Sequence, residues 1–308
     1  MLAMRQVLQL VLYVGIGIFM QNRKMVGLDF DRQLNTLYSD IVLPCMIFNS
    51  LQMDFDPADL KNCALLLLLS VGYLLLSALL GQLCYRRIGG DMGRIVRFGT
   101  IFTNFTLMGF PLIESLYGSH TLFYFVVFLI PLRMIFYSGA KVLLSPPELT
   151  HPHTTWGQKV KNYFSPPMVA VFVGLAFYLL QWRLPWVLGD VVSGLGSTSS
   201  VLGMLTCGLV LGKQPLKQLL RPRYVLVSAL RLLLLPGFFF LLLAPLPIDD
   251  ELRKVVVMCA ALPIASLTAS FTLRYNKNPD AQFDAAGSVL VSHLLCILTI
   301  PIWTTLLG

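Results

Sequence analysis

The chain has 308 residues, of which 56% are hydrophobic and only 12% are charged, and its formal net charge is +8 at pH 7. Soluble domains carry about 25% charged residues, so this composition excludes a soluble globular protein and indicates a protein embedded in a lipid bilayer. A net positive charge would suggest a nucleic-acid partner for a soluble protein, but here the basic residues follow the loops between apolar segments. We therefore expect the bilayer as a partner and no nucleic acid.

Ten apolar segments follow one another along the chain and form two sets of five. The first set covers 4–21, 34–52, 60–84, 95–117 and 121–143, and the second covers 165–182, 192–212, 222–245, 253–274 and 283–305. A bilayer core needs about 20 apolar residues per helix, and corresponding segments start 158 to 162 residues apart. An odd number of spans per set inverts the second copy. The pattern predicts an all-α membrane protein whose ten transmembrane helices form two inverted five-helix repeats, 1–143 and 165–308, joined by a cytoplasmic loop, 144–164.

The basic residues are distributed unevenly between the two sides of this arrangement. Of the 23 lysines and arginines, 16 lie in the loops of one side and 5 in those of the other. Cytoplasmic loops carry the excess, which predicts both termini outside the cell membrane. The six cysteines lie in or beside apolar segments without CxxC spacing, so we expect packing residues, no metal and no cofactor. The sequence offers no nucleophile with a base, and we expect no enzyme.

The fourth and ninth segments combine helix-breaking and polar residues in mid-span. These residues are Thr103, Asn104, Gly109 and Pro111 in the fourth segment, and Pro263, Ser266 and Thr268 in the ninth. Proline removes a helical hydrogen bond, and freed backbone groups are tolerated in lipid only inside protein or at a water-filled cavity. We therefore predict helix breaks at Gly109, Pro111 and Pro263, with half-helix N-termini that suit an anion. Ordinary kinking is the alternative, and we assign it to Pro44, Pro131, Pro236 and Pro301.

The candidate substrate-binding residues follow from these breaks. Asn104 and Thr103 are candidate donors to a carboxylate, with Ser266 and Thr268 as their counterparts in the ninth segment. Asn49 in the second segment is a further candidate on the surrounding wall.

Two arginines fall within predicted spans, where a guanidinium is costly and faces the bundle interior, a cavity or a partner. Arg133 is either a countercharge for the substrate or a structural partner of Glu114 or of carbonyls at a half-helix C-terminus. The same alternatives apply to Arg231. Glu114 is the one carboxylate well inside a predicted span, and Asp59 is expected to be a solvated loop charge. No coupling ion is evident from this supply of acids.

Glycines in the seventh segment predict close helix packing. The pattern Gly208-xxx-Gly212 lets two helix backbones approach each other. The contact lies either within one bundle or across a dimer.

Short motifs at the fourth and ninth segments resemble the auxin efflux carrier family. Asn104-x-x-x-Met108-Gly109-x-Pro111-Leu112, Ala260-Ala261-Leu262-Pro263 and Tyr275-Asn276-x-x-Pro279-Asp280 carry the resemblance, which spans nearly the whole chain. It implies a homodimer with a scaffold of helices 1, 2, 6 and 7, and a transport part of helices 3–5 and 8–10 that moves as an elevator. It also implies that helices 4 and 9 cross, and that Asn104 contacts a substrate carboxylate. Thr103 and Thr268 stand where plant members have proline.

These observations predict a secondary transporter of small organic anions, with a small carboxylate and a second copy of the chain as partners. Auxin-like acids, malate and malonate are the substrates that the resemblance implies. A sodium-coupled symporter of the bile-acid type and a non-transporting membrane sensor on the same fold are the alternatives.

Overall fold

The computed structural model describes residues 2–27, 29–146, 165–213, 221–276 and 278–308. Within these residues the secondary structure is helical and contains no strand, only an isolated antiparallel bridge between Thr103 and Ile264. The predicted all-α class is thereby confirmed. Most of the predicted loop, 144–164, lies outside the described residues.

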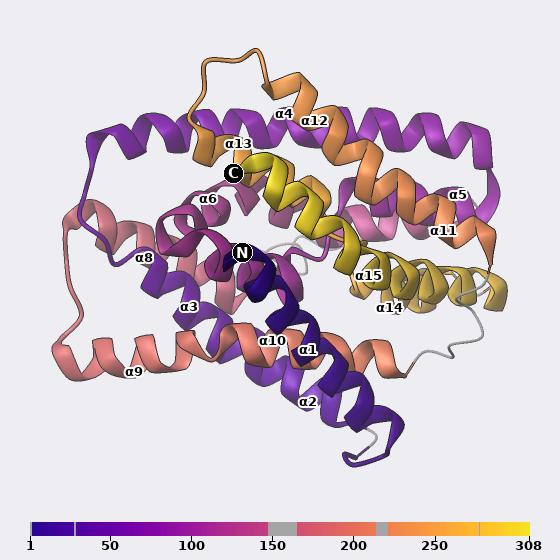
Figure 1. The fold of residues 1–308 in the computed structure, drawn as a ribbon, viewed down its shortest axis with the longest axis horizontal. Helices are drawn as coiled ribbons and strands as arrows, with labels where there is room; N and C mark the ends of the chain where they lie inside the picture. Colours follow the sequence, from indigo (N-terminus) through magenta and orange to yellow (C-terminus); the bar gives the residue numbers. More distant parts are fainter. Residues whose placement is uncertain (1, 28, 147–164, 214–220, 277) are drawn as a thin grey trace. The chain divides into compact units, whose positions relative to one another are not determined.

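The helices follow the predicted apolar segments along the chain (Figure 1). Before the loop the elements are α1 (Leu2–Asn22), α2 (Phe30–Leu37), the π-helix η1 (Tyr38–Val42), α3 (Leu43–Ser50), α4 (Pro57–Ile88), α5 (Gly90–Ile101), the π-helix η2 (Phe105–Gly109) and α6 (Phe110–Leu144). After it they are α8 (Pro166–Leu180), α9 (Trp186–Ser197), α10 (Ser199–Gly212), α11 (Pro222–Ala229), the π-helix η5 (Leu230–Leu234), α12 (Leu235–Leu243), α13 (Asp250–Ala261), α14 (Leu267–Tyr275) and α15 (Pro279–Leu307).

Five helices of the described chain are long and apolar enough to cross a membrane. They are Pro57–Ile88, Phe105–Phe136, Trp186–Gly212, Pro222–Leu243 and Pro279–Leu307, and two shorter apolar helices are Leu8–Asn22 and Pro166–Leu180. The chain is therefore a multi-pass membrane protein. Ten spans in inverted repeats remain a prediction.

Local sequence signals account for several helix boundaries. Proline begins α4, α8, α11 and α15, which suits a first turn because the missing N–H has no helical acceptor there. The side chain of Asp249 accepts a hydrogen bond from the Glu251 N–H at the start of α13, and Asn278 does the same for Asp280 at the start of α15. Gly118 inside α6 has φ 82°, a conformation that glycine adopts without strain, and it separates the fourth predicted segment from the fifth.

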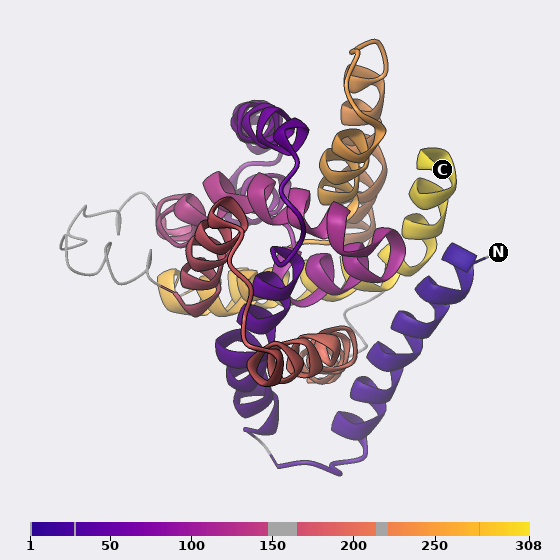
Figure 2. The same cartoon turned by 90° about the vertical axis from the view of Figure 1, so that its left-hand side faces the viewer.

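The described residues pack into two compact units. The first consists of Met1–Leu68, Thr106–Ile130 and Trp156–Lys213, and the second of Leu69–Phe105, Pro131–Thr155 and Gln214–Gly308. In the first unit α1 packs along α10, and α3 packs against α8 and α9. In the second unit α15 packs against α11, α13 and α14, while α12 and α13 run side by side (Figure 2).

Glycines bring α1 and α10 together within the first unit. A Cβ atom at Gly208 would lie 2.1 Å from the Val14 carbonyl oxygen, and one at Gly17 would lie 2.4 Å from the Leu205 carbonyl oxygen. No side chain fits at those distances, so both positions require glycine. The close approach predicted from Gly208-xxx-Gly212 therefore occurs within the chain.

Three prolines follow π-helices in the described residues. Pro44, Pro111 and Pro236 each stand two residues beyond the end of η1, η2 and η5. A wider π-turn relieves the clash between a proline ring and the carbonyl four residues earlier. The freed carbonyls find other donors: the Tyr38 hydroxyl donates to the Thr106 oxygen at 2.9 Å, and the Trp303 indole to the Leu232 oxygen at 2.8 Å. Pro131 and Pro301 instead lie inside α6 and α15.

Candidate functional site

Two extended stretches of the second unit interrupt the predicted fourth and ninth helices. One lies between α5 and η2, where Phe102 has φ −110° and ψ 127°. The other lies between α13 and α14, where Leu262 has φ −66° and ψ 149°, the conformation that a following proline favours. The fourth helix is thus interrupted at Phe102–Asn104 rather than at Gly109 and Pro111. Those two residues lie in the helical run that starts at Phe105, since the π-turn accommodates the proline.

The two stretches run antiparallel and bond to each other through their backbones. The Asn104 N–H donates to the Pro263 oxygen at 2.9 Å, the Ala265 N–H donates to the Phe102 oxygen at 3.4 Å, and Thr103 and Ile264 form the bridge between them. Each stretch supplies partners for backbone groups that the other has lost from its helix. This mutual bonding gives partners to buried backbone groups that the interruption would otherwise leave unpaired.

Asn104 is the polar centre of this crossing. Its side chain is buried, with the residue 3% exposed, and its Nδ2 lies 2.7 Å from Nε2 of His293 on α15. Nδ1 of His293 lies 2.8 Å from the Val289 carbonyl oxygen, which only accepts, so Nδ1 carries the proton and Nε2 of the neutral ring accepts from Asn104. The Ser266 hydroxyl donates to Asn104 Oδ1 at 3.4 Å. The amide is therefore held in one orientation.

The two candidate threonines are also buried at the crossing. The Thr103 hydroxyl lies 4.0 Å from the Cys259 sulfur. The Thr268 hydroxyl donates to the Ala265 carbonyl at 2.6 Å, so in this conformation it bonds to its own backbone, as threonine does where a helix begins or bends. Ser266 stands at the N-cap of α14.

The other candidate residues lie in different surroundings. The Arg133 guanidinium stands over the Phe105 ring, 5.7 Å from its centroid. Arg231 donates to backbone carbonyls of α5 and α13. These bonds correspond to the structural alternative from the sequence, in which Arg231 pairs with carbonyls at the C-terminus of a half-helix. Asn49 lies on α3 in the first unit and is half-buried, and its place in a substrate path remains a prediction. Glu114 accepts from the Ser199 hydroxyl at 3.3 Å.

Sequence reasoning missed His293. A signal was present, because an ionisable side chain in the middle of an apolar span of a membrane protein suggests a functional site. The three-dimensional contact with Asn104 joins residues 189 positions apart, and no local pattern indicates it.

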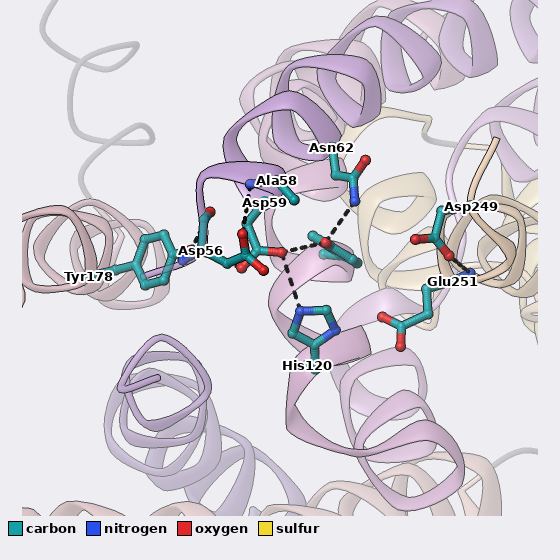
Figure 3. A network of polar contacts seen from close by, with 9 residues as sticks. Asp56, Ala58, Asp59, Asn62, His120, Tyr178, Asp249 and Glu251 are labelled. Carbon is teal, nitrogen blue, oxygen red and sulfur yellow. Dashed lines mark hydrogen bonds and ion pairs between the residues drawn. The ribbon is translucent and has the colours of Figure 1, made fainter. Parts of the chain in front are cut away.

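A second buried polar cluster lies in the first unit, around Asp59 (Figure 3). The expectation of a solvated loop charge is wrong for this residue, which is 3% exposed. Its carboxylate accepts from the Tyr124 hydroxyl at 2.5 Å, from the Tyr178 hydroxyl at 2.8 Å and from His120 at 3.3 Å. Burial of this charge is tolerated because several donors surround it.

The Asp59–Tyr124 contact has a counterpart in the second unit. There the Tyr224 hydroxyl donates to Asp284 at 2.8 Å, and Arg223 donates to the same carboxylate oxygen at 2.5 Å. Tyr224 stands in the second set of apolar segments at nearly the position that Asp59 has in the first, and Asp284 at the position that Tyr124 has. The pair recurs with tyrosine and aspartate exchanged between the two partner helices.

Crossed, interrupted helices in a multi-pass helical protein define a class in which non-helical backbone holds a ligand at membrane depth. The chain matches the family described as membrane transport protein over residues 2–304. It therefore belongs to this family, the auxin efflux carriers, and is a membrane transporter. A search of curated proteins finds no match.

Proposed function

We propose that the chain is a secondary transporter of small organic anions that binds one carboxylate at the crossing. The observation that carries this proposal is the position of Asn104. Its amide lies beside the first residue of the helical run from Phe105 and within hydrogen-bond distance of Ser266, the N-cap of α14. Half-helix N-termini present unpaired N–H groups and a positive dipole end, which favour an anion.

Each candidate residue has a role in this proposal. The Asn104 amide and the Thr103 hydroxyl donate to the carboxylate from one segment, and Ser266 donates from the other once its hydroxyl leaves Asn104 Oδ1. Thr268 joins them once its hydroxyl leaves the Ala265 carbonyl. Arg133 balances the charge, and Asn49 belongs to the surrounding wall.

Burial of the crossing supports alternating access as the mechanism. Thr103, Asn104 and Thr268 are almost inaccessible in this conformation, so a substrate reaches them only when the protein rearranges. The crossing lies wholly in the second unit, whereas α1, α3, α8 and α10 lie in the first. The elevator motion of helices 3–5 and 8–10 along a scaffold of helices 1, 2, 6 and 7 is part of the proposal on the strength of the family alone, because Thr106–Ile130 of the predicted fourth and fifth helices packs in the first unit. A homodimer in the cell membrane with both termini outside belongs to the same proposal.

A thermal-shift screen of the purified protein tests the substrate class. Malonate, malate, indole-3-acetate and neutral amide analogues of each form the panel. A ligand that binds only the folded state stabilises it by about 2.7 kcal/mol at 100 times its Kd, so the acids should raise Tm and the amides should not. Equal shifts for acids and amides would contradict the proposal.

Counterflow in proteoliposomes then separates transport from sensing. Liposomes loaded with the best acid should accumulate its labelled form from outside. Binding without counterflow would indicate a sensor, and accumulation only in the presence of sodium would indicate a sodium-coupled symporter.

A further inference from the structure

The crossing has a side opposite to the proposed anion site. Where the helical runs from Phe105 and Leu267 begin, α5 and α13 have just ended, at Ile101 and Ala261. The last carbonyls of a helix lack intrahelical donors, and each C-terminus carries roughly half a negative elementary charge. Two such ends together amount to about one negative charge inside the protein.

Arg231 supplies a positive charge to both of these helix ends. One guanidinium nitrogen donates to the Thr100 carbonyl of α5 at 3.3 Å, and another donates to the Cys259 carbonyl of α13 at 3.4 Å. The residue is only 3% exposed. It projects from the π-helix η5, whose widened turn places the side chain there without a break in the chain.

In transporters with broken helices, unwound carbonyls and half-helix C-terminal ends are the groups that coordinate a coupling cation. Here two of these carbonyls already accept from the Arg231 guanidinium, a cation that is part of the chain itself. The planar group presents several N–H donors in a fixed geometry, and two of its nitrogens reach the two helix ends.

We propose that Arg231 is the resident cation of the crossing, which neutralises the C-terminal ends of α5 and α13 in place of a coupling ion. Transport of an anion at the opposite side of the crossing then needs no sodium. This last consequence rests on the proposed function. The structural role of Arg231 does not depend on it.

Three Arg231 variants test the structural role in ligand-free protein. Arg231→Ala removes two charge-assisted hydrogen bonds and should lower Tm by about 5 °C or more. Guanidinium chloride at low millimolar concentration, far below denaturing levels, should restore part of that loss by filling the space. Leu235→Ala, which truncates a buried side chain at the start of α12, is the matched control and should gain nothing from guanidinium.

If Arg231→Ala does not fold, Arg231→Lys and Arg231→Met replace it. The proposal predicts that Arg231→Lys is more stable than Arg231→Met, since only lysine keeps the charge. No rescue of Arg231→Ala by guanidinium, or a methionine variant as stable as the lysine variant, would overturn the structural role.

Sodium replacement in the wild-type protein tests the consequence for transport. If sodium were coupled to transport, its removal would change substrate affinity by about 5-fold or more. The proposal has no coupled sodium, so replacing sodium with choline should leave the Tm shift caused by malonate, and malonate counterflow, unchanged. A sodium-dependent affinity would overturn this part. Absence of any malonate binding would count against the proposed function and leave the guanidinium result standing.

Discussion

The cluster around Asp59 and the cluster around Asn104 are both buried and polar, but they differ in charge and in the groups that surround them. Asp59 carries a negative charge and is already surrounded by the hydroxyls of Tyr124 and Tyr178 and by His120. Asn104 is neutral and lies beside Ser266 and the N-terminal ends of half-helices.

The difference indicates which cluster suits a negatively charged substrate. The Asp59 carboxylate repels a second anion, and the hydrogen bonds that it already accepts stabilise the packing of α4 against α6 and α8. Neutral donors and positive dipole ends attract an anion. We therefore expect substitutions at Asn104 and its partners to change affinity, and substitutions at Asp59 to change stability.

The largest effect is expected at His293. His293→Leu removes the acceptor for Asn104 Nδ2, which frees the amide to rotate and leaves a buried donor unpaired at a cost of about 1–3 kcal/mol. Carboxylate affinity should fall by roughly 10-fold or more, measured by titration in the thermal-shift assay. His293→Gln can place an acceptor near the position of Nε2 and should recover part of the affinity. An unchanged carboxylate affinity in the leucine variant would show that His293 does not orient the Asn104 amide for binding.

The second-largest effect is expected from Asp59→Asn, which alters the cluster that we do not assign to the substrate. An asparagine NH₂ group cannot accept from a tyrosine hydroxyl, so one buried donor loses its partner and stability falls by about 1–3 kcal/mol. Thermal unfolding measures this loss, while the affinity of the folded protein for carboxylate should stay the same. A large change of affinity with unchanged Tm would mean that the Asp59 cluster is part of the site.

Pro263→Ala tests whether the crossing depends on its proline, and a small effect is expected. The Pro263 carbonyl that accepts from the Asn104 N–H is present in alanine as well. The cost should be below about 1 kcal/mol, mainly from greater freedom of the unfolded chain. Transport should persist. Loss of transport in a folded variant would show that mutual backbone bonding alone does not maintain the interruption.

The smallest effect concerns Asp91, outside the membrane at the start of α5. Its carboxylate accepts from Asn276 and Asn278 at 2.7 and 2.8 Å and pairs with Arg94. Partial burial alone would raise the pKa of Asp91, but the hydrogen bonds from Asn278 and Asn276 and the Arg94 charge together hold it below its ordinary value.

A lowered carboxyl pKa stabilises the folded state above the unfolded pKa, and the contribution disappears as pH falls through the folded value. The Tm of the wild type should therefore decrease below about pH 4 more steeply than that of Asp91→Asn. Asp54→Asn, at an exposed ion pair with Arg183, is the control and should follow the wild type. Parallel curves for wild type and Asp91→Asn would contradict the assignment.

Sequence reasoning identified the helices and the crossing segments for a physical reason. Spans in lipid need long apolar runs, and polar residues such as Asn104 and Ser266 stand out within them. The position of the first interruption was missed because no proline imposes it. The backbone pairing of Asn104 with Pro263, residues far apart in sequence, sustains it.

The buried states of Asp59 and His293 depend in the same way on tertiary contacts. Asp59 is three residues into α4, where the sequence alone indicates a helix end near water. Its donors come from α6 and α8. Only the fold brings these groups together.

The affinity of Asn104→Ala for malonate tests the central claim most directly. Wild type, Asn104→Ala and Asn62→Ala are compared by thermal shift, where Asn62 is a matched amide that donates to Tyr124 in the first unit. We predict that malonate raises the Tm of the wild type and of Asn62→Ala but not that of folded Asn104→Ala. An equal rise in all three would contradict an anion site at the crossing.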